Sequence, residues 1–114
     1  MQKNNSIGEK LVELLSPIVD LSYIQAEVSK FPYCAYDIES LTPIKDKQGI
    51  RAFNASVSIY VVEKTESQAD EMKNKIIGAL KREKYWDFSL QNITAATDNG
   101  HWSYRIEYSI TQIV

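Results

Sequence analysis

Alternation of apolar and polar residues marks two long segments of the chain as β-strands. From Arg51 to Glu63, and again from His101 to Ile113, apolar residues recur at every second position and mostly polar residues fall between them. Successive side chains of a strand point to opposite faces of a sheet, so both segments predict a sheet with one covered face and one polar face. The residues expected on the covered face are Phe53, Ala55, Val57, Ile59, Val61, Trp102, Tyr104, Ile106, Tyr108 and Ile110.

Helical spacing of apolar residues predicts two helices. The first runs from about Ser6 to Leu15, and Ser6 and Glu9 have the spacing of a capping box. The second begins at Thr65, with Gln68 at the same spacing, and its acidic residues come early and its basic residues late, as the helix dipole favours. Its buried stripe is expected to comprise Ala69, Met72, Ile76, Ile77, Ala79 and Leu80.

Two further strands complete the predicted fold. They are expected at about 33–41 and 88–96, whereas residues 18–30 are ambiguous and could add a helical turn. The polar segment from Thr42 to Gly49 predicts a long, flexible hairpin loop, and Asp98-Asn99-Gly100 predicts a tight turn. The order α-β-β-α-β-β predicts one α+β domain over residues 1–114, with a four-stranded antiparallel sheet and the helices packed on one face.

Composition narrows the classes of function. The 13 basic and 15 acidic residues give a net charge of -2, whereas a free-standing nucleic-acid binder normally carries a basic excess. No apolar run approaches the roughly 20 residues of a membrane helix. The first residues lack the basic and apolar regions of a signal peptide, and a single cysteine fits a reducing compartment. We therefore expect a soluble protein in the cytoplasm, with no nucleic-acid or membrane partner.

No pattern of residues indicates catalysis, a metal or a cofactor. His101 is the only histidine and lies at a predicted turn, and Cys34 is the only cysteine and lies among apolar strand residues. The four glycines are isolated, so no phosphate-binding loop is present. We therefore expect neither an enzyme nor a cofactor. The one enzymatic alternative is a site assembled from four charged strand residues, namely Asp37, Glu39, Arg105 and Glu107.

A series of features along nearly the whole chain resembles one known family. A short N-terminal helix precedes Phe31-Pro32-Tyr33, and the strand that these residues open continues to Tyr36. A Thr42-Pro43 step and a polar loop follow, and Arg51 then opens the strand that ends Ile59-Tyr60-Val61-Val62. A helix begins at Thr65 to Ala69, and a closing hairpin ends on a long strand. In these features the chain resembles the small tail-completion, or tail-terminator, proteins of long-tailed phages and prophages.

The resemblance implies a structural protein of the virion. Members of this family form a ring, usually of six copies, that caps the tail tube and joins it to the head. The implied partners are further copies of the chain and other tail or head-completion proteins. The implied location is the host cytoplasm during assembly and the virion afterwards.

Function would then reside in surfaces, and three are implied: the loop from Thr42 to Arg51, the sheet edges and the polar sheet face. The candidate interaction residues are Lys45, Asp46, Lys47, Arg51, Arg105 and Glu107. We expect the loop to be mobile until assembly. Charge reversal at Lys47 or Arg105 should weaken the ring without unfolding the subunit. The alternative function is a small ligand-binding or regulatory module of ferredoxin-like type, which would need a pocket with convergent polar groups.

Overall fold

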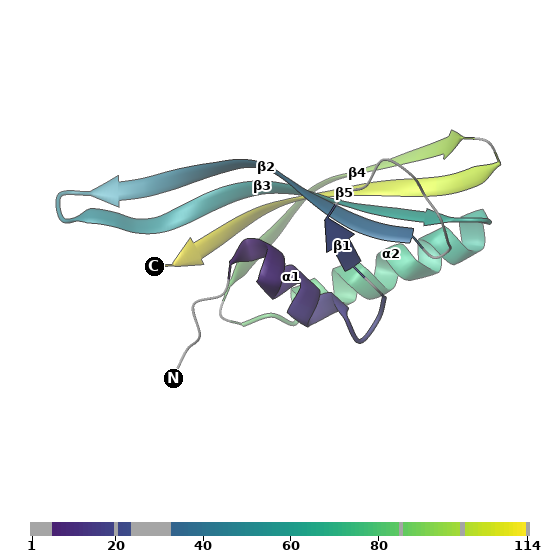
Figure 1. The fold of residues 1–114 in the computed structure, drawn as a ribbon, viewed down its shortest axis with the longest axis horizontal. Helices are drawn as coiled ribbons and strands as arrows, with labels where there is room; N and C mark the ends of the chain where they lie inside the picture. Colours follow the sequence, from purple (N-terminus) through teal and green to yellow (C-terminus); the bar gives the residue numbers. More distant parts are fainter. Residues whose placement is uncertain (1–5, 20, 24–32, 85, 99, 114) are drawn as a thin grey trace.

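A single sheet with two helices on one face forms the body of the protein (Figure 1). The computed structural model of the chain describes residues 6–19, 21–23, 33–84, 86–98 and 100–113. The sheet has the order β1-β2-β3-β5-β4, and its pairs are antiparallel except for the parallel pair of β1 and β2. The elements are α1 (Ile7–Leu15), β1 (Leu21–Tyr23), β2 (Tyr33–Asp46), β3 (Gly49–Glu63), α2 (Glu66–Lys81), β4 (Asp87–Asp98) and β5 (His101–Ile113).

The α+β class and the four predicted antiparallel strands are confirmed. Strand β1 is an addition, because its three residues lie within the segment that the sequence left ambiguous and pair with residues 34–36 of β2. Such a short strand has too few residues for a visible period of two, so only its partner strand defines it. Residues 24–30 of that ambiguous segment lie outside the described residues.

Capping interactions define where both helices begin. The Ser6 hydroxyl accepts a hydrogen bond from the Glu9 amide at 3.1 Å, and the Glu9 carboxylate accepts one from the Ser6 amide at 3.2 Å. This capping box is the predicted one, and α1 ends with Ser16 as its C-cap. The Thr65 hydroxyl caps α2 by accepting a hydrogen bond from the Gln68 amide at 3.2 Å.

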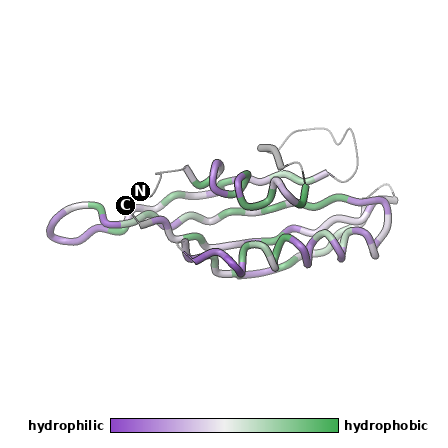
Figure 2. The backbone as a smooth tube through the Cα atoms, turned by 90° about the horizontal axis from the view of Figure 1, so that it is seen from below, coloured by the Kyte–Doolittle hydropathy of each residue, from purple (hydrophilic) through white to green (hydrophobic). Residues whose placement is uncertain are grey.

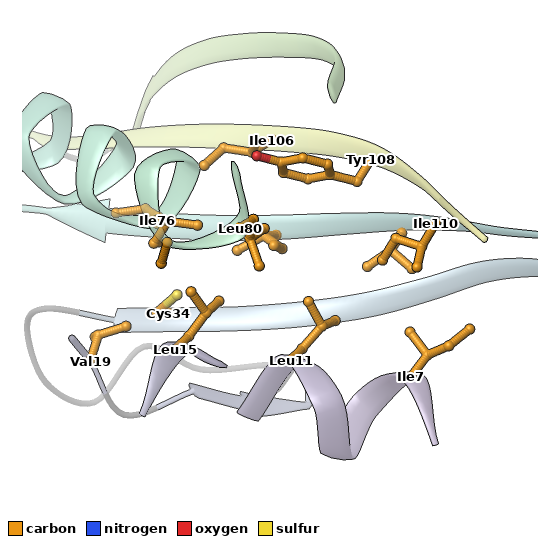
Figure 3. Close-up of a cluster of buried hydrophobic side chains, with 14 of the residues drawn as sticks. Ile7, Leu11, Leu15, Val19, Cys34, Ile76, Leu80, Ile106, Tyr108 and Ile110 are labelled. Atoms are coloured by element: carbon orange, nitrogen blue, oxygen red, sulfur yellow. The ribbon is translucent and has the colours of Figure 1, made fainter. Parts of the chain in front are cut away.

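The hydrophobic core lies between the two helices and the strands β2, β3 and β5 (Figure 3). Helix α1 contributes Ile7, Leu11 and Leu15 to this core, and α2 contributes mainly Ile76 and Leu80. The sheet contributes the alternate residues of its strands, as the period of two predicted, and the face opposite the helices is the polar one. The residues of β3 and β5 that are fully buried in this core are Ala55, Val57, Ile59, Val61, Ile106 and Ile110.

Trp102 departs from its predicted place in the core. It is only half-buried, and it lies opposite Glu63 and Thr97 on the last rung of the β3–β5 ladder. Tyr104 is also half-buried, although it packs against the core. The alternation therefore identified the correct face of β5. The buried residues of this strand are Ile106, Tyr108 and Ile110, so burial does not extend to the residues at its start.

The predicted loop from Thr42 to Gly49 is wrong, because these residues continue the β2–β3 hairpin. Strand β2 runs to Asp46, β3 starts at Gly49, and only residues 47–48 form the turn. Gly49 adopts a positive φ of 116°, and the Asp46 carboxylate accepts a hydrogen bond from the Gln48 amide at 2.8 Å. Residues 41–51, here called the β2–β3 arm, project beyond the helices (Figure 1) and extend the molecule to 52 × 25 × 21 Å.

Candidate functional site

The six predicted interaction residues lie in two separate places. Lys45, Asp46, Lys47 and Arg51 surround the tip of the arm, whereas Arg105 and Glu107 lie on the sheet face opposite the helices. Arg105 pairs with Tyr60, and Tyr60 lies eleven residues after Gly49, the first residue of β3. At a rise of about 3.3 Å per residue, the two places are about 35 Å apart, so they are two distinct surfaces.

The tip of the arm carries charge, and the residues behind it are apolar. An ion pair joins Arg51 and Asp46 at 3.3 Å, and the Arg51 side chain is 73% exposed. Leu41, Ile44 and Ile50 are also exposed, by 53%, 44% and 47%. Figure 2 shows the hydrophilic tip with hydrophobic stretches directly behind it.

The apolar residues of the arm lie on both of its faces. Leu41 pairs with Ala55, whose side chain points to the helix side of the sheet. Ile44 pairs with Ala52, which belongs to the alternate set of residues and therefore points to the opposite face. Neither described helix covers these apolar side chains of the arm. A two-stranded ribbon without a packed layer is marginally stable in water, so the arm has little stability of its own.

An Arg–Glu–Ser network occupies the polar face of the sheet. The Nη2 atom of Arg105 donates to the two carboxylate oxygens of Glu39 at 3.0 and 3.1 Å, and its Nε atom donates to the Ser58 hydroxyl at 3.1 Å. The Ser58 hydroxyl in turn donates to Glu39. Because these two longer side chains converge on it, Ser58 is fully buried although no helix in the described part of the chain lies on this face.

Further polar contacts extend the network along the sheet. Glu107 lies 3.4 Å from Arg105, whose guanidinium also lies 5.9 Å from the centre of the Tyr60 ring. Farther along, the Asn54 amide donates to Ser109 at 3.0 Å. The sequence grouped Arg105 with Asp37, Glu39 and Glu107, and the structure brings Glu39 and Glu107 to Arg105, whereas Asp37 pairs with Ser58 in the β2–β3 ladder. The sequence did not indicate the burial of Ser58. Glu39 and Arg105 are 66 positions apart, so only the sheet register brings them together.

The electrostatics of this network do not favour acid–base chemistry. Hydrogen bonds from Ser58 and Arg105 lower the pKa of Glu39, and the hydrogen bond to Glu39 raises the pKa of Arg105. A carboxylate whose pKa is lowered is a weaker base, whereas a general base works best with a pKa near the operating pH. Glu39, Arg105 and Glu107 therefore form a charge-paired network, and Ser58, being buried, is not accessible to a substrate.

Other candidate positions have little access to a ligand. Cys34 is buried, and this burial raises the pKa of its thiol to about 12. A cavity of about 180 Å³ lies beside α2, lined by Glu63 and four helix residues. It is smaller than the roughly 300–1,000 Å³ of typical small-molecule sites. Among the described residues, no three His, Cys, Asp or Glu side chains are grouped to hold a metal ion.

Neither protein-family models nor curated proteins match the sequence. In the described part of the chain, both helices are too short or too polar to cross a membrane.

Proposed function

We propose that this chain is a structural subunit of the tail-completion type, which assembles head-to-tail into a ring at the head–tail junction of a phage or prophage particle. The observation that carries the proposal is the β2–β3 arm, with its exposed Leu41, Ile44 and Ile50. Burying apolar surface contributes about 25 cal/mol per Å², so the arm gains stability by lying against another protein.

Several other features support an assembly role. A ring needs two different complementary patches on each copy, and this chain has a projecting arm at one end and, along its side, the edge strand β4, which neither described helix covers. An edge strand offers unpaired backbone groups to a neighbour. The net charge of -2 imposes little repulsion between equal subunits.

The proposed partners are further copies, with six as the ring size that the resemblance implies, and other tail or head-completion proteins. Assembly would take place in the host cytoplasm, and the ring would remain in the virion. A ligand-binding module, the alternative, has less support because the cavity beside α2 is small and the polar network satisfies its own hydrogen bonds.

The test is to remove the arm tip without disturbing the core. Ile44 and Ala52 are opposite each other in the ladder, so an Asn-Gly turn can replace residues 45–51 between them. Leu41→Thr and Ile44→Thr in the same variant remove the remaining exposed apolar side chains of the arm. In sedimentation velocity at rising concentration, or on a tail tube, the natural chain should form a closed ring of several copies. The shortened variant should remain monomeric with an unchanged melting temperature. A two-fold dimer as the only assembly, together with turnover of a small molecule, would overturn the proposal.

A further inference from the structure

A small cavity lies where β3 ends and α2 begins, at the end of the molecule opposite the β2–β3 arm (Figure 1). Its volume is about 180 Å³. One lining residue, Glu63, belongs to the strand. The other four lie on one face of the helix, at helical spacing, and are Gln68, Glu71, Met72 and Lys75. Polar groups from two elements therefore converge on one space.

Glu63 is an acidic residue at the end of a row of core residues. It follows Val57, Ile59 and Val61 at every second position of β3, and it is only 8% exposed. In the described part of the chain, no hydrogen bond or ion pair joins its carboxylate to another residue. Every fully buried polar side-chain atom there has a hydrogen-bond partner, so the Glu63 oxygen atoms are not sealed from solvent and open into the cavity. A carboxylate in such a place costs stability unless it is paired.

The charged groups that line the cavity leave one negative charge without compensation. The Lys75 ammonium pairs with the Glu71 carboxylate at 3.4 Å. Glu63 has no such partner, and burial and the nearby Glu71 raise the pKa of its carboxyl. A positive charge close to a carboxylate stabilises the ionised form. A ligand with a single positive charge would therefore balance the site, whereas a divalent cation would leave an excess of positive charge unless Lys75 moved away.

The acceptors around the cavity match a primary ammonium group, which has three N–H donors. The carboxylates of Glu63 and Glu71 supply two acceptors, and the amide oxygen of Gln68 supplies a third. This amide oxygen accepts a hydrogen bond from the Thr65 hydroxyl at 3.1 Å, which favours one orientation of the amide and leaves the second lone pair for a ligand. The Met72 side chain adds an apolar wall for the alkyl chain that carries the ammonium.

We propose that this cavity binds a primary alkylammonium group, with Glu63 as its counter-ion and with Glu71 and Gln68 as further acceptors. The group can belong to a small free amine or to a lysine side chain of another protein. The small volume of the cavity restricts the ligand to a short chain. This inference does not rest on the proposed function, because the cavity and the arm lie at opposite ends of β3.

Titration with n-butylamine at about pH 7, followed by amide chemical shifts in NMR spectra, tests the site. The shifts should be largest around Glu63 and the first half of α2, with a Kd of about 1 mM, as the few heavy atoms of the ligand allow. Butyltrimethylammonium has the same charge without N–H donors and should bind about tenfold more weakly. N-acetyl-lysine N-methylamide distinguishes the sources of the ligand. Its binding would show that the site accepts a lysine side chain, whereas binding of n-butylamine alone would assign the site to free amines.

Three variants separate the site from general effects of charge. Glu63→Gln removes the counter-ion and should weaken n-butylamine binding about tenfold. Glu66→Gln is the matched control, because Glu66 is exposed in the first turn of α2, loses the same charge and does not line the cavity. Lys75→Gln removes a competing ammonium and should strengthen binding about threefold, a gain that a damaged fold cannot produce.

The melting temperature of each variant verifies that the chain remains folded. The proposal is overturned if n-butylamine causes no shifts up to about 50 mM, far above the expected Kd. It is also overturned if the natural chain and Glu63→Gln bind n-butylamine equally, or if Lys75→Gln binds it more weakly.

Discussion

The pair formed by Glu39 and Arg105 yields a prediction about stability that depends on pH. We consider Arg105→Ala, Glu39→Gln and the double variant as a double-mutant cycle. Arg105→Ala removes three hydrogen bonds, two to Glu39 and one to Ser58, and leaves Glu39 and Glu107 without their shared cation. The cycle isolates the energy that belongs to the pair itself.

The expected coupling energy is about 1 kcal/mol at neutral pH. A buried hydrogen bond to a charged group contributes roughly 1.5–3 kcal/mol, whereas an exposed ion pair contributes roughly 0.2–1 kcal/mol. The side chains of Arg105 and Glu39 are 40% and 35% exposed, so solvent screening places the pair near the upper end of the exposed range. For a domain of this size, 1 kcal/mol corresponds to about 4 °C in melting temperature.

The sign of the pH dependence follows from the lowered pKa of Glu39. A carboxylate whose pKa is lower in the folded state than in the unfolded state stabilises the fold above the unfolded pKa, about 4.5. This contribution is lost as the pH falls through the lowered value. Urea unfolding of the four proteins at about pH 7 and about pH 2 should therefore show the coupling at neutral pH and its loss in acid.

Arg105→Lys provides the control for charge alone. Lysine retains the positive charge, but its single nitrogen cannot reproduce the separate Nε and Nη2 contacts with Ser58 and Glu39, so part of the stability should be lost. A coupling energy that is equal at both pH values, or near zero at pH 7, would refute this account. The network also changes an earlier expectation. Charge reversal at Arg105 should destabilise the subunit itself, so Lys47 is the cleaner probe of assembly.

Three further predictions concern the body of the protein. Ile59→Ala should cost about 2–5 kcal/mol in urea unfolding, because Ile59 is fully buried, and half-buried Trp102→Ala should cost less; the reverse order would contradict the core assignment. Burial and the nearby Glu71 raise the pKa of Glu63 above its ordinary value of 4.5. Ionisation of this carboxyl therefore lowers the stability of the fold as the pH rises from the unfolded pKa through the raised folded pKa. Glu63→Gln should therefore raise the melting temperature at pH 7 but change it little in acid, and a decrease at pH 7 would contradict this. Cys34, with its pKa raised to about 12, should react slowly with iodoacetamide at pH 8 in the folded protein and rapidly in urea, and equal rates would show that it is not buried.

Local patterns in the sequence were sufficient for most elements. The capping box at Ser6 and the N-cap at Thr65 start the helices where they were predicted, because a cap depends on residues three positions apart. Alternation assigned the correct face to β3 and β5, because period two is a property of a single strand. The arm was missed because Pro43 and Gly49 are typical of loops. Pro43 is tolerated because, among the described residues, β2 pairs with β1 only at residues 34–36, which leaves the Pro43 stretch at the edge of the described sheet.

The sequence by itself determined the two helices, the four long strands and their order, the polar and apolar faces and the charged residues of the arm, but neither β1 nor the extension of the hairpin into the arm. Only the tertiary structure decided which residues meet: β1 beside β2, Arg105 beside Glu39, and Trp102 at the rim instead of the core. It also decided that Leu90 and Ile93 lie beyond the helix layer. The physical reason is that periodicity and capping act over a few residues. Strand order and register are set by contacts between residues far apart in the chain, and these contacts determine which apolar residues the helices cover.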